Sequence, residues 1–330
     1  MQPSASPHGL AALQIVAARQ RRWWAGLALA ALLALSILGW YAVQLRQSSE
    51  RNAQLGTEAS ALALEGHLSR TVAAAANTQE ALAGTTLVSA AAINPHALSR
   101  LLAQQLQGQP FLRSVSVLDD QGVVLASSHA PDAGLRVPLA QLRPADTALG
   151  VDRVGPLLQV RHLGELAPGA TPSAWSTALP MVRSVRAADG STRWLVLLLN
   201  LAYVTNQHGL ATGDQPLRAL VLDLTGTVLA RTGPDDRKTG DRLPDWPVTA
   251  RLQANRDHGS NVGAGSDGQR VAAAYRASPR WPLVALAEMP YAVVVEARQL
   301  QLTVAGVLTL APTCCAGPGP TWAGPSRSWC

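Results

Sequence analysis

An internal repeat of ten residues constrains the fold more than any other feature of the sequence. Residues 117–126 read VLDDQGVVLA and residues 221–230 read VLDLTGTVLA, and seven of the ten positions are identical. In each copy, two apolar runs flank a polar turn with an Asp that can accept backbone hydrogen bonds and a Gly that can adopt a positive φ, which is typical of a β-hairpin. The copies lie 104 residues apart, about the length of one small module. We therefore predict tandem modules that arose by duplication.

Further strand and turn patterns follow each copy. The first copy is followed by apolar runs at 175–185 and 193–201, with the turn Ala-Asp-Gly between them. The second is followed by the turn Ser-Asp-Gly and by apolar runs at 270–278 and 281–289. The sequence therefore predicts an α+β fold in which both modules contain antiparallel sheets, an arrangement that resembles PAS-like modules.

Residues 23–45 form an uncharged, strongly apolar segment of 23 residues. That length is sufficient for a helix to cross the hydrocarbon core of a bilayer, about 30 Å thick. Trp23 and Trp24 at one end, and Trp40 and Tyr41 near the other, are typical of side chains at membrane interfaces. A cleaved signal peptide would have a shorter apolar region, so we predict a permanent transmembrane helix.

The net charge of +6 is concentrated at the N-terminus. Residues 1–46 contain four arginines and no acidic residue, whereas residues 47–298 have a net charge of only +1. A nearly neutral body does not favour nucleic-acid binding, which requires a basic surface. By the positive-inside rule, residues 1–22 are expected in the cytoplasm and the body on the far side of the membrane.

Residues 46–92 are rich in Ala, Leu, Glu and Gln, contain no proline, and have apolar residues at steps of three and four. This spacing predicts a long extracytoplasmic helix that continues from the membrane. Its apolar stripe fits packing on the helix's own domain or, equally well, pairing with a second copy in a homodimer. Asn94-Pro95 ends this helix, and a shorter one follows.

The C-terminal region is composed differently from the rest. Residues 299–311 have the composition of the start of a second transmembrane helix, and residues 312–330 are irregular and rich in Pro and Gly. We interpret this tail as out-of-frame translation that truncates a longer receptor. All three cysteines lie within it, so no disulfide or cysteine-based metal site is expected in the body.

Segments 117–126, 179–203 and 267–289, in this order after a membrane helix and a long helix, resemble the double-Cache sensor domains of bacterial transmembrane receptors. The resemblance implies a membrane-distal module at 93–208 that binds a small molecule and a membrane-proximal module at 209–298. It further implies a cytoplasmic (inner) membrane protein with one or two membrane passes and a periplasmic sensor. The output domain of such receptors, a histidine kinase or diguanylate cyclase, is missing from this chain.

No catalytic or cofactor motif is found in its proper context: Gly263, Gly265 and Gly268 form a GxGxxG, but it precedes a predicted strand instead of opening a helix. The seven histidines are scattered, without the HExxH spacing of zinc enzymes, and GxSxG elbows and P-loops are absent. We therefore expect no enzymatic activity, no cofactor and no metal site.

Three residues are the candidates for ligand binding: Trp175, Arg183 and Asn200. By two-residue alternation, Trp175 and Arg183 share one side of their strand, and Asn200 shares a side of the next strand with Trp194. Arg183 could bind a carboxylate through two hydrogen bonds, with Trp175 as a wall. The alternative is that Arg183 lies on a solvated face and Trp175 fills the core.

The ligand class is only partly constrained. Double-Cache receptors for amino acids have a signature of Tyr, Arg, Trp and Asp residues that we do not find here, which disfavours an amino acid and leaves another organic acid open. The expected function is extracytoplasmic sensing of a small molecule by a membrane receptor. The alternative is a membrane-anchored envelope protein that uses the same modules without signalling.

Overall fold

The computed structural model describes residues 7–90, 94–144, 148, 150–171, 176–213, 216–232, 239–242, 247–296 and 299. Trp175, the tail 312–330 and all but the first residue of the segment 299–311 lie outside these residues. The chain divides into two compact units. Both sheets belong to the unit Ala53–Val293, and the other unit comprises Met1–Asn52 with Val294–Cys330.

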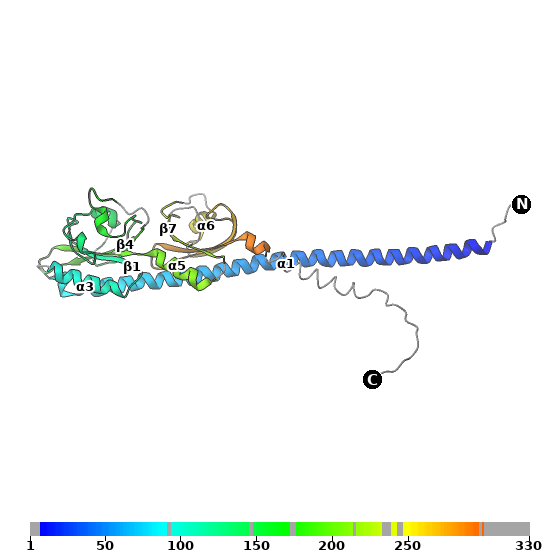
Figure 1. Cartoon of the computed structure of the whole chain (residues 1–330), viewed down its shortest axis with the longest axis horizontal. Helices are drawn as coiled ribbons and strands as arrows, with labels where there is room; N and C mark the ends of the chain where they lie inside the picture. Colours follow the sequence, from blue (N-terminus) through cyan, green and yellow to red (C-terminus); the bar gives the residue numbers. More distant parts are fainter. Residues whose placement is uncertain are drawn as a thin grey trace, which may run out of the picture. The chain divides into compact units, whose positions relative to one another are not determined.

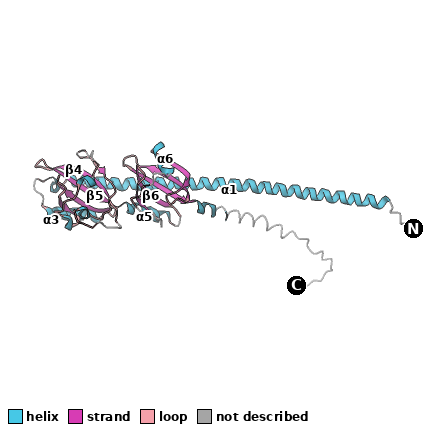
Figure 2. Ribbon diagram, turned by 90° about the horizontal axis from the view of Figure 1, so that it is seen from above, coloured by secondary structure: helices cyan, strands magenta, loops and turns pink. Residues whose placement is uncertain are grey.

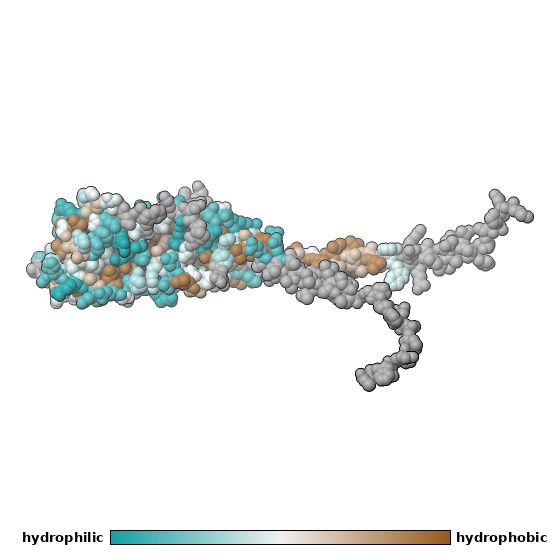
Figure 3. All heavy atoms as spheres, in the orientation of Figure 1, coloured by the Kyte–Doolittle hydropathy of each residue, from teal (hydrophilic) through white to brown (hydrophobic). Residues whose placement is uncertain are grey.

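The helix α1, Pro7–Ala83, contains the uncharged segment 23–45. Among the described residues it is the one helix that is long and apolar enough to cross a membrane, judged by length and composition. Its apolar side chains in this segment are exposed, Trp23 by 68% and Leu29 by 62%, and they form the brown band in Figure 3. The helix ends at Ala83, earlier than the predicted residue 92, and Gly84, a weak helix former, follows it.

Short helices follow α1, two of them before the first strand and the others between strands. α3 begins after Asn94, whose Oδ1 accepts a hydrogen bond from the Ala97 N–H at 3.1 Å, and Pro95 occupies its first position. Both features are favourable at a helix N-terminus. The described short helices are α2 (Thr86–Ser89), α3 (Pro95–Gln107), η1 (Ala130–Asp132), α4 (Leu139–Leu142), η2 (Leu163–Leu166), α5 (Leu201–Thr212) and α6 (Pro247–Ala254).

Two antiparallel five-stranded sheets form the body, as the sequence predicts (Figures 1 and 2). The distal sheet has the order β2-β1-β5-β4-β3, and the proximal sheet repeats it as β7-β6-β10-β9-β8. The distal strands are β1 (Leu112–Leu118), β2 (Val124–Ser127), β3 (Arg153–Val154), β4 (Leu179–Arg186) and β5 (Thr192–Leu199). The proximal strands are β6 (Arg218–Asp223), β7 (Val228–Arg231), β8 (His258–Ala264), β9 (Arg270–Ala277) and β10 (Leu283–Pro290).

The repeat forms the same hairpin in both modules, which confirms the prediction. In the distal hairpin, Asp119 Oδ1 accepts from the N–H groups of Gln121 and Val123 at 2.9 and 2.8 Å. In the proximal hairpin, Asp223 Oδ1 accepts from two backbone N–H groups in the same way, at 2.8 Å each. The turn glycines of the two copies have φ of 81° and 86°, values that disfavour any residue with a Cβ.

One face of each sheet packs on α1; we call it the helix side and the opposite face the far side. The helix sides share one continuous core, in which Leu64 and Leu68 of α1 lie with Met181 of the distal sheet and Ala285 of the proximal sheet. The far sides have separate cores, one for each module. The long helix therefore packs against both modules through a single core.

Candidate ligand-binding groove

Arg183 lies on the helix side of the distal sheet. It alternates with Leu179 and Met181 of the core shared with α1, and its Nη1 lies 3.1 Å from Asp152 Oδ1 in a mostly buried ion pair. Burial raises the pKa of the Asp152 carboxyl, and the Arg183 guanidinium partly opposes that shift. Arg183 is therefore not on a fully solvated face, but its charge is already neutralised by a carboxylate of the chain.

Asn200 lies far from Arg183 along the same pair of strands. The register pairs Arg183 with Leu195 and Leu179 with Leu199, so Asn200 lies five positions beyond the residue opposite Arg183. At about 3.3 Å per residue, that is about 16 Å. Asn200 is the N-cap residue of α5, and its Oδ1 is buried without a hydrogen-bond partner among the described atoms. The structure does not bring these two predicted residues together, and Trp175 is not described.

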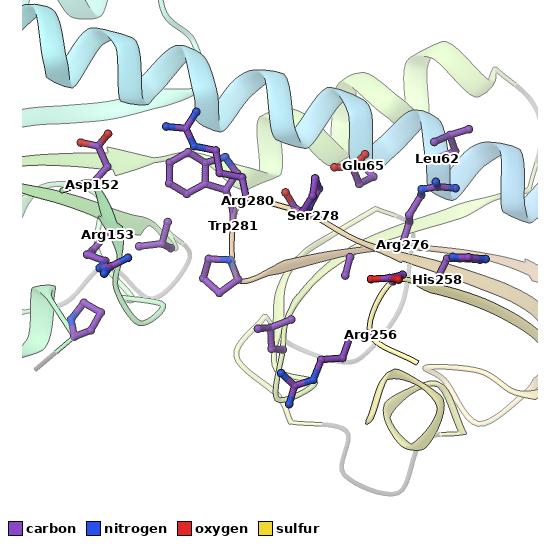
Figure 4. A pocket seen from close by; sticks show the side chains of 17 residues that line it. Leu62, Glu65, Asp152, Arg153, Arg256, His258, Arg276, Ser278, Arg280 and Trp281 are labelled. Carbon is purple, nitrogen blue, oxygen red and sulfur yellow. The ribbon is translucent and has the colours of Figure 1, made fainter. Parts of the chain in front are cut away.

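A groove of about 1020 Å³ opens between the modules beside α1 (Figure 4). Asp152 and Arg153 come from the distal module, Glu65 comes from α1, and Arg280 and Trp281 come from the loop before β10. We call it the inter-module groove. Its charged and ionisable lining residues are Glu65, Asp152, Arg153, Arg256, Asp257, His258, Arg276 and Arg280.

Positive charge predominates in the inter-module groove. Four arginines face three carboxylates along its lining. Trp281 adds an apolar wall that is only 7% exposed, with the Arg280 guanidinium 5.0 Å from its ring centroid. A cationic groove with one aromatic wall is suited to a small organic anion.

The arginines of the groove were not predicted as site residues, although the repeat contains a signal for one of them. Arg276 pairs with Ala285 in the proximal sheet, as Arg183 pairs with Leu195 in the distal one. Both arginines lie on the helix side at equivalent positions of their modules. A repeat alignment extended beyond the hairpin would have identified Arg276 as the counterpart of Arg183.

Polar contacts join α1 to both modules. In the distal module, the buried Gln79 donates from Nε2 to the carbonyl oxygens of Met181 and Leu195, at 3.0 and 2.8 Å. Next to the proximal sheet, Ser69 Oγ lies 2.9 Å from Ser278 Oγ, beside the inter-module groove. Because these partners are short side chains or backbone atoms, a shift of either module relative to α1 would lengthen these hydrogen bonds.

A hydrogen bond also joins α1 to α5, the helix between the two sheets. Ser60 Oγ lies 2.8 Å from Nε2 of the buried His208. Burial, and secondarily the neighbouring His67, lowers the pKa of His208. The burial of this contact therefore favours the neutral form of the imidazole.

Solved structures share this arrangement of helix and sheets. The extracellular domain of rpHK1S-Z16, a protein assigned as a histidine kinase, is 16% identical with a TM-score of 0.59, over 73% of this chain and 95% of that domain. The periplasmic sensory domain of the Campylobacter jejuni chemoreceptor Tlp1 is 12% identical with a TM-score of 0.54, over 76% and 98%. The body has the double-Cache fold.

A second chemoreceptor domain with this fold has a described ligand. The sensory domain of C. jejuni Tlp3, solved with isoleucine bound, is 11% identical with a TM-score of 0.50, over 77% of this chain and 97% of that domain. No protein-family model matches the sequence, and no curated protein matches it. The double-Cache fold is therefore established by structure rather than by sequence similarity.

Proposed function

We propose that the chain is the extracytoplasmic sensing portion of a membrane signal-transduction receptor, with its small-molecule ligand bound by the membrane-distal module. One observation carries the proposal: two double-Cache modules pack through one continuous core on a helix that also contains a segment of membrane-spanning length. A ligand that favours one arrangement of the modules would bias the position of that helix. The proposed location is the cytoplasmic membrane, with the sensor in the periplasm.

Arg183 and the inter-module groove define the proposed ligand class, a small organic acid. In the bound state the ligand carboxylate would replace Asp152 on the Arg183 guanidinium, and the nearby Arg280 would add a second cation. Two observations support this exchange. The Asp152 carboxyl lines the groove, and burial raises its pKa, so the burial of this ion pair is costly for Asp152.

A thermal-shift screen of the full chain in detergent tests the ligand proposal. At a ligand concentration of about 100 times Kd we expect the melting temperature to rise by about 5–10 °C. Arg183→Gln should weaken binding at least about tenfold, because a charge-assisted hydrogen bond is lost. Arg186→Gln, an exposed arginine of the same strand, is the matched control and should bind as the unmodified chain does.

Other outcomes would contradict parts of this proposal. Binding that is equal in the Arg183→Gln and Arg186→Gln variants would remove Arg183 from the site. The absence of a shift with any organic acid, amine or nucleobase would instead favour a membrane-anchored envelope protein that does not signal.

We also infer that the receptor is a homodimer paired along α1. Leu55 and Leu62 lie seven residues apart on one helical face and are 62% and 49% exposed. A Leu55→Cys variant, made after replacing the three native cysteines by serine, should form a disulfide-linked dimer in membranes. Leu210→Cys, an exposed position on α5, is the control, and equal cross-linking of the two variants would argue against pairing along α1.

A further inference from the structure

Three potential metal ligands from two connections meet on the membrane-distal module. His129 precedes η1, Asp132 ends η1, and His162 precedes η2. The Nδ1 atoms of His129 and His162 lie 3.0 and 2.7 Å from the same carboxylate oxygen, Asp132 Oδ1. The two imidazole rings are 4.0 Å apart between centroids.

The carboxylate at the centre of this cluster is buried and incompletely satisfied. Asp132 is only 1% exposed, and its Oδ2 has no hydrogen-bond partner among the described atoms. Leaving a buried charged oxygen without a partner is costly. The backbone of η2 also comes close to this carboxylate, since a Cβ at Gly164 would overlap Asp132 Oδ1. The fold therefore encloses a carboxylate with one oxygen that has no partner among the described atoms.

The contacts of His162 fit a metal ion at the centre of the cluster. Its Nε2 lies 3.5 Å from Glu165 Oε1, a carboxylate that favours a proton on Nε2. Nδ1 then presents a lone pair to Asp132 Oδ1, and two lone pairs at 2.7 Å repel each other unless a proton or a metal ion lies between them. A carboxylate on the outer nitrogen of a metal-bound histidine is a common arrangement in metal sites.

We propose that His129, Asp132 and His162 form a site for a divalent transition-metal ion such as Zn²⁺. Two imidazole nitrogens and a carboxylate suit zinc, copper or nickel better than calcium or magnesium. Tetrahedral coordination at 2.0–2.1 Å places neighbouring ligand atoms about 3.3 Å apart. All three donor atoms lie within 4.8 Å of one another, so small side-chain rotations are sufficient to accommodate the ion.

The exposure of the two histidines leaves the coordination sphere open. His129 is 43% exposed and His162 27% exposed, so water can supply the remaining ligand. The ion would tie η1 to η2, whose Leu163 belongs to the far-side core of the distal sheet. This inference does not depend on the proposed function, because the cluster uses no residue of the inter-module groove.

Zinc titration of the full chain in detergent, purified with a tag that contains no histidine, tests the proposal. Competition with a chromophoric chelator should show one Zn²⁺ per chain, and His129→Gln and His162→Gln should each weaken binding at least about tenfold. His96→Gln, an exposed histidine at the start of α3, is the control and should leave the affinity unchanged.

A spectroscopic measurement keeps the test independent of variant stability. Cu²⁺ bound to the unmodified chain should give an electron paramagnetic resonance spectrum with coupling to imidazole nitrogen, and His129→Gln should reduce that coupling. His129 is the more exposed of the two histidines, so its variant is expected to fold. Failure to bind stoichiometric Zn²⁺, or affinity that is equal in the His162→Gln and His96→Gln variants, would overturn the proposal.

Discussion

The distal and proximal sheets are equivalent strand by strand, but side chains of different sizes fill their helix sides. The distal sheet presents the pair Met181 and Leu197 to α1, where the proximal sheet presents Ala274 and Ala287. The two alanines pack with Ala61 of α1 in a cluster of small residues. At these positions the small side chains of the proximal sheet let its backbone approach α1 closely. The larger side chains of the distal sheet bury more apolar surface against α1.

The far sides of the two sheets differ even more. In the distal module the connection from β2 to β4 contains η1, α4, β3 and η2, whereas the equivalent proximal connection contains α6 and β8. Register also places Leu198 of the distal sheet where the proximal sheet has Glu288. Glu288 is fully buried, accepts hydrogen bonds from Ser266, and has a pKa raised by that burial. The hairpins and the strand order are therefore common to both modules, and the modules differ in the side chains that face α1, in the buried Glu288 and in the connections between the strands.

The largest expected effect tests the apolar attachment of the distal sheet. Met181→Ala should lower the free energy of unfolding by about 2–5 kcal/mol, because Met181 is fully buried and its truncation leaves a cavity. Urea unfolding of the full chain in detergent, followed by tryptophan fluorescence, measures the change. Leu210→Ala, at a position 76% exposed, should change stability little. A similarly small effect of Met181→Ala would contradict the proposed role of buried area.

The reciprocal change tests close approach at the proximal sheet. Ala274→Met introduces a long side chain among Ala61 and Ala287 and should destabilise the protein by about 1–3 kcal/mol through overpacking. The same urea measurement applies, with Ala59→Met on an exposed part of α1 as the control. If Ala274→Met were neutral or stabilising, the space between α1 and the proximal sheet would be larger than described.

The repeated hairpins should respond equally to the same substitution. Asp119→Ala and Asp223→Ala each remove an acceptor of two backbone N–H groups and should each cost about 1–2 kcal/mol. The exposed neighbour Asp120 provides the control Asp120→Ala. Unequal costs, measured by thermal unfolding, would show that the two copies have diverged energetically while their geometry remained the same.

The smallest effect is a pH dependence at His208, between the two modules. Burial lowers its pKa in the folded protein, so the unfolded chain binds more protons below its ordinary pKa of about 6.5. Stability should therefore be full above that pH and decrease as the pH falls below it. His208→Gln should weaken this dependence between pH 7.5 and pH 5.5, whereas the exposed His96→Gln should leave it unchanged. An identical pH profile in both variants would contradict the assignment.

Local signals predicted the fold better than the site. The hairpin at Asp119 and Gly122 and the helix start at Asn94 depend on neighbouring residues, so the sequence contained what was needed to predict them. Strand β8 was not predicted, because His258–Ala264 is polar and rich in glycine and pairs only as an edge strand. Its ladder with β9 compensates for its weak intrinsic preference.

The sites depend on contacts between distant residues. Asp152 and Arg280 line one groove although 127 intervening residues separate them in the sequence. His129 and His162 meet at Asp132 only because η1 and η2 lie side by side. No spacing rule for ligands on a single helix or hairpin predicts either arrangement, so the spacing of the histidines did not indicate the cluster at Asp132.

In each module, the strand order places the start of the first strand beside the end of the last strand. β1 pairs antiparallel with β5, with Leu112 opposite Leu199, and β6 pairs with β10, with Arg218 opposite Glu288. The first and last strands of each module are thus central neighbours, and the variable connections lead to the sheet edges. The connections that lead to the sheet edges can therefore change in length and sequence without moving the first and last strands, so the points at which each module joins the rest of the chain stay fixed while its edges vary.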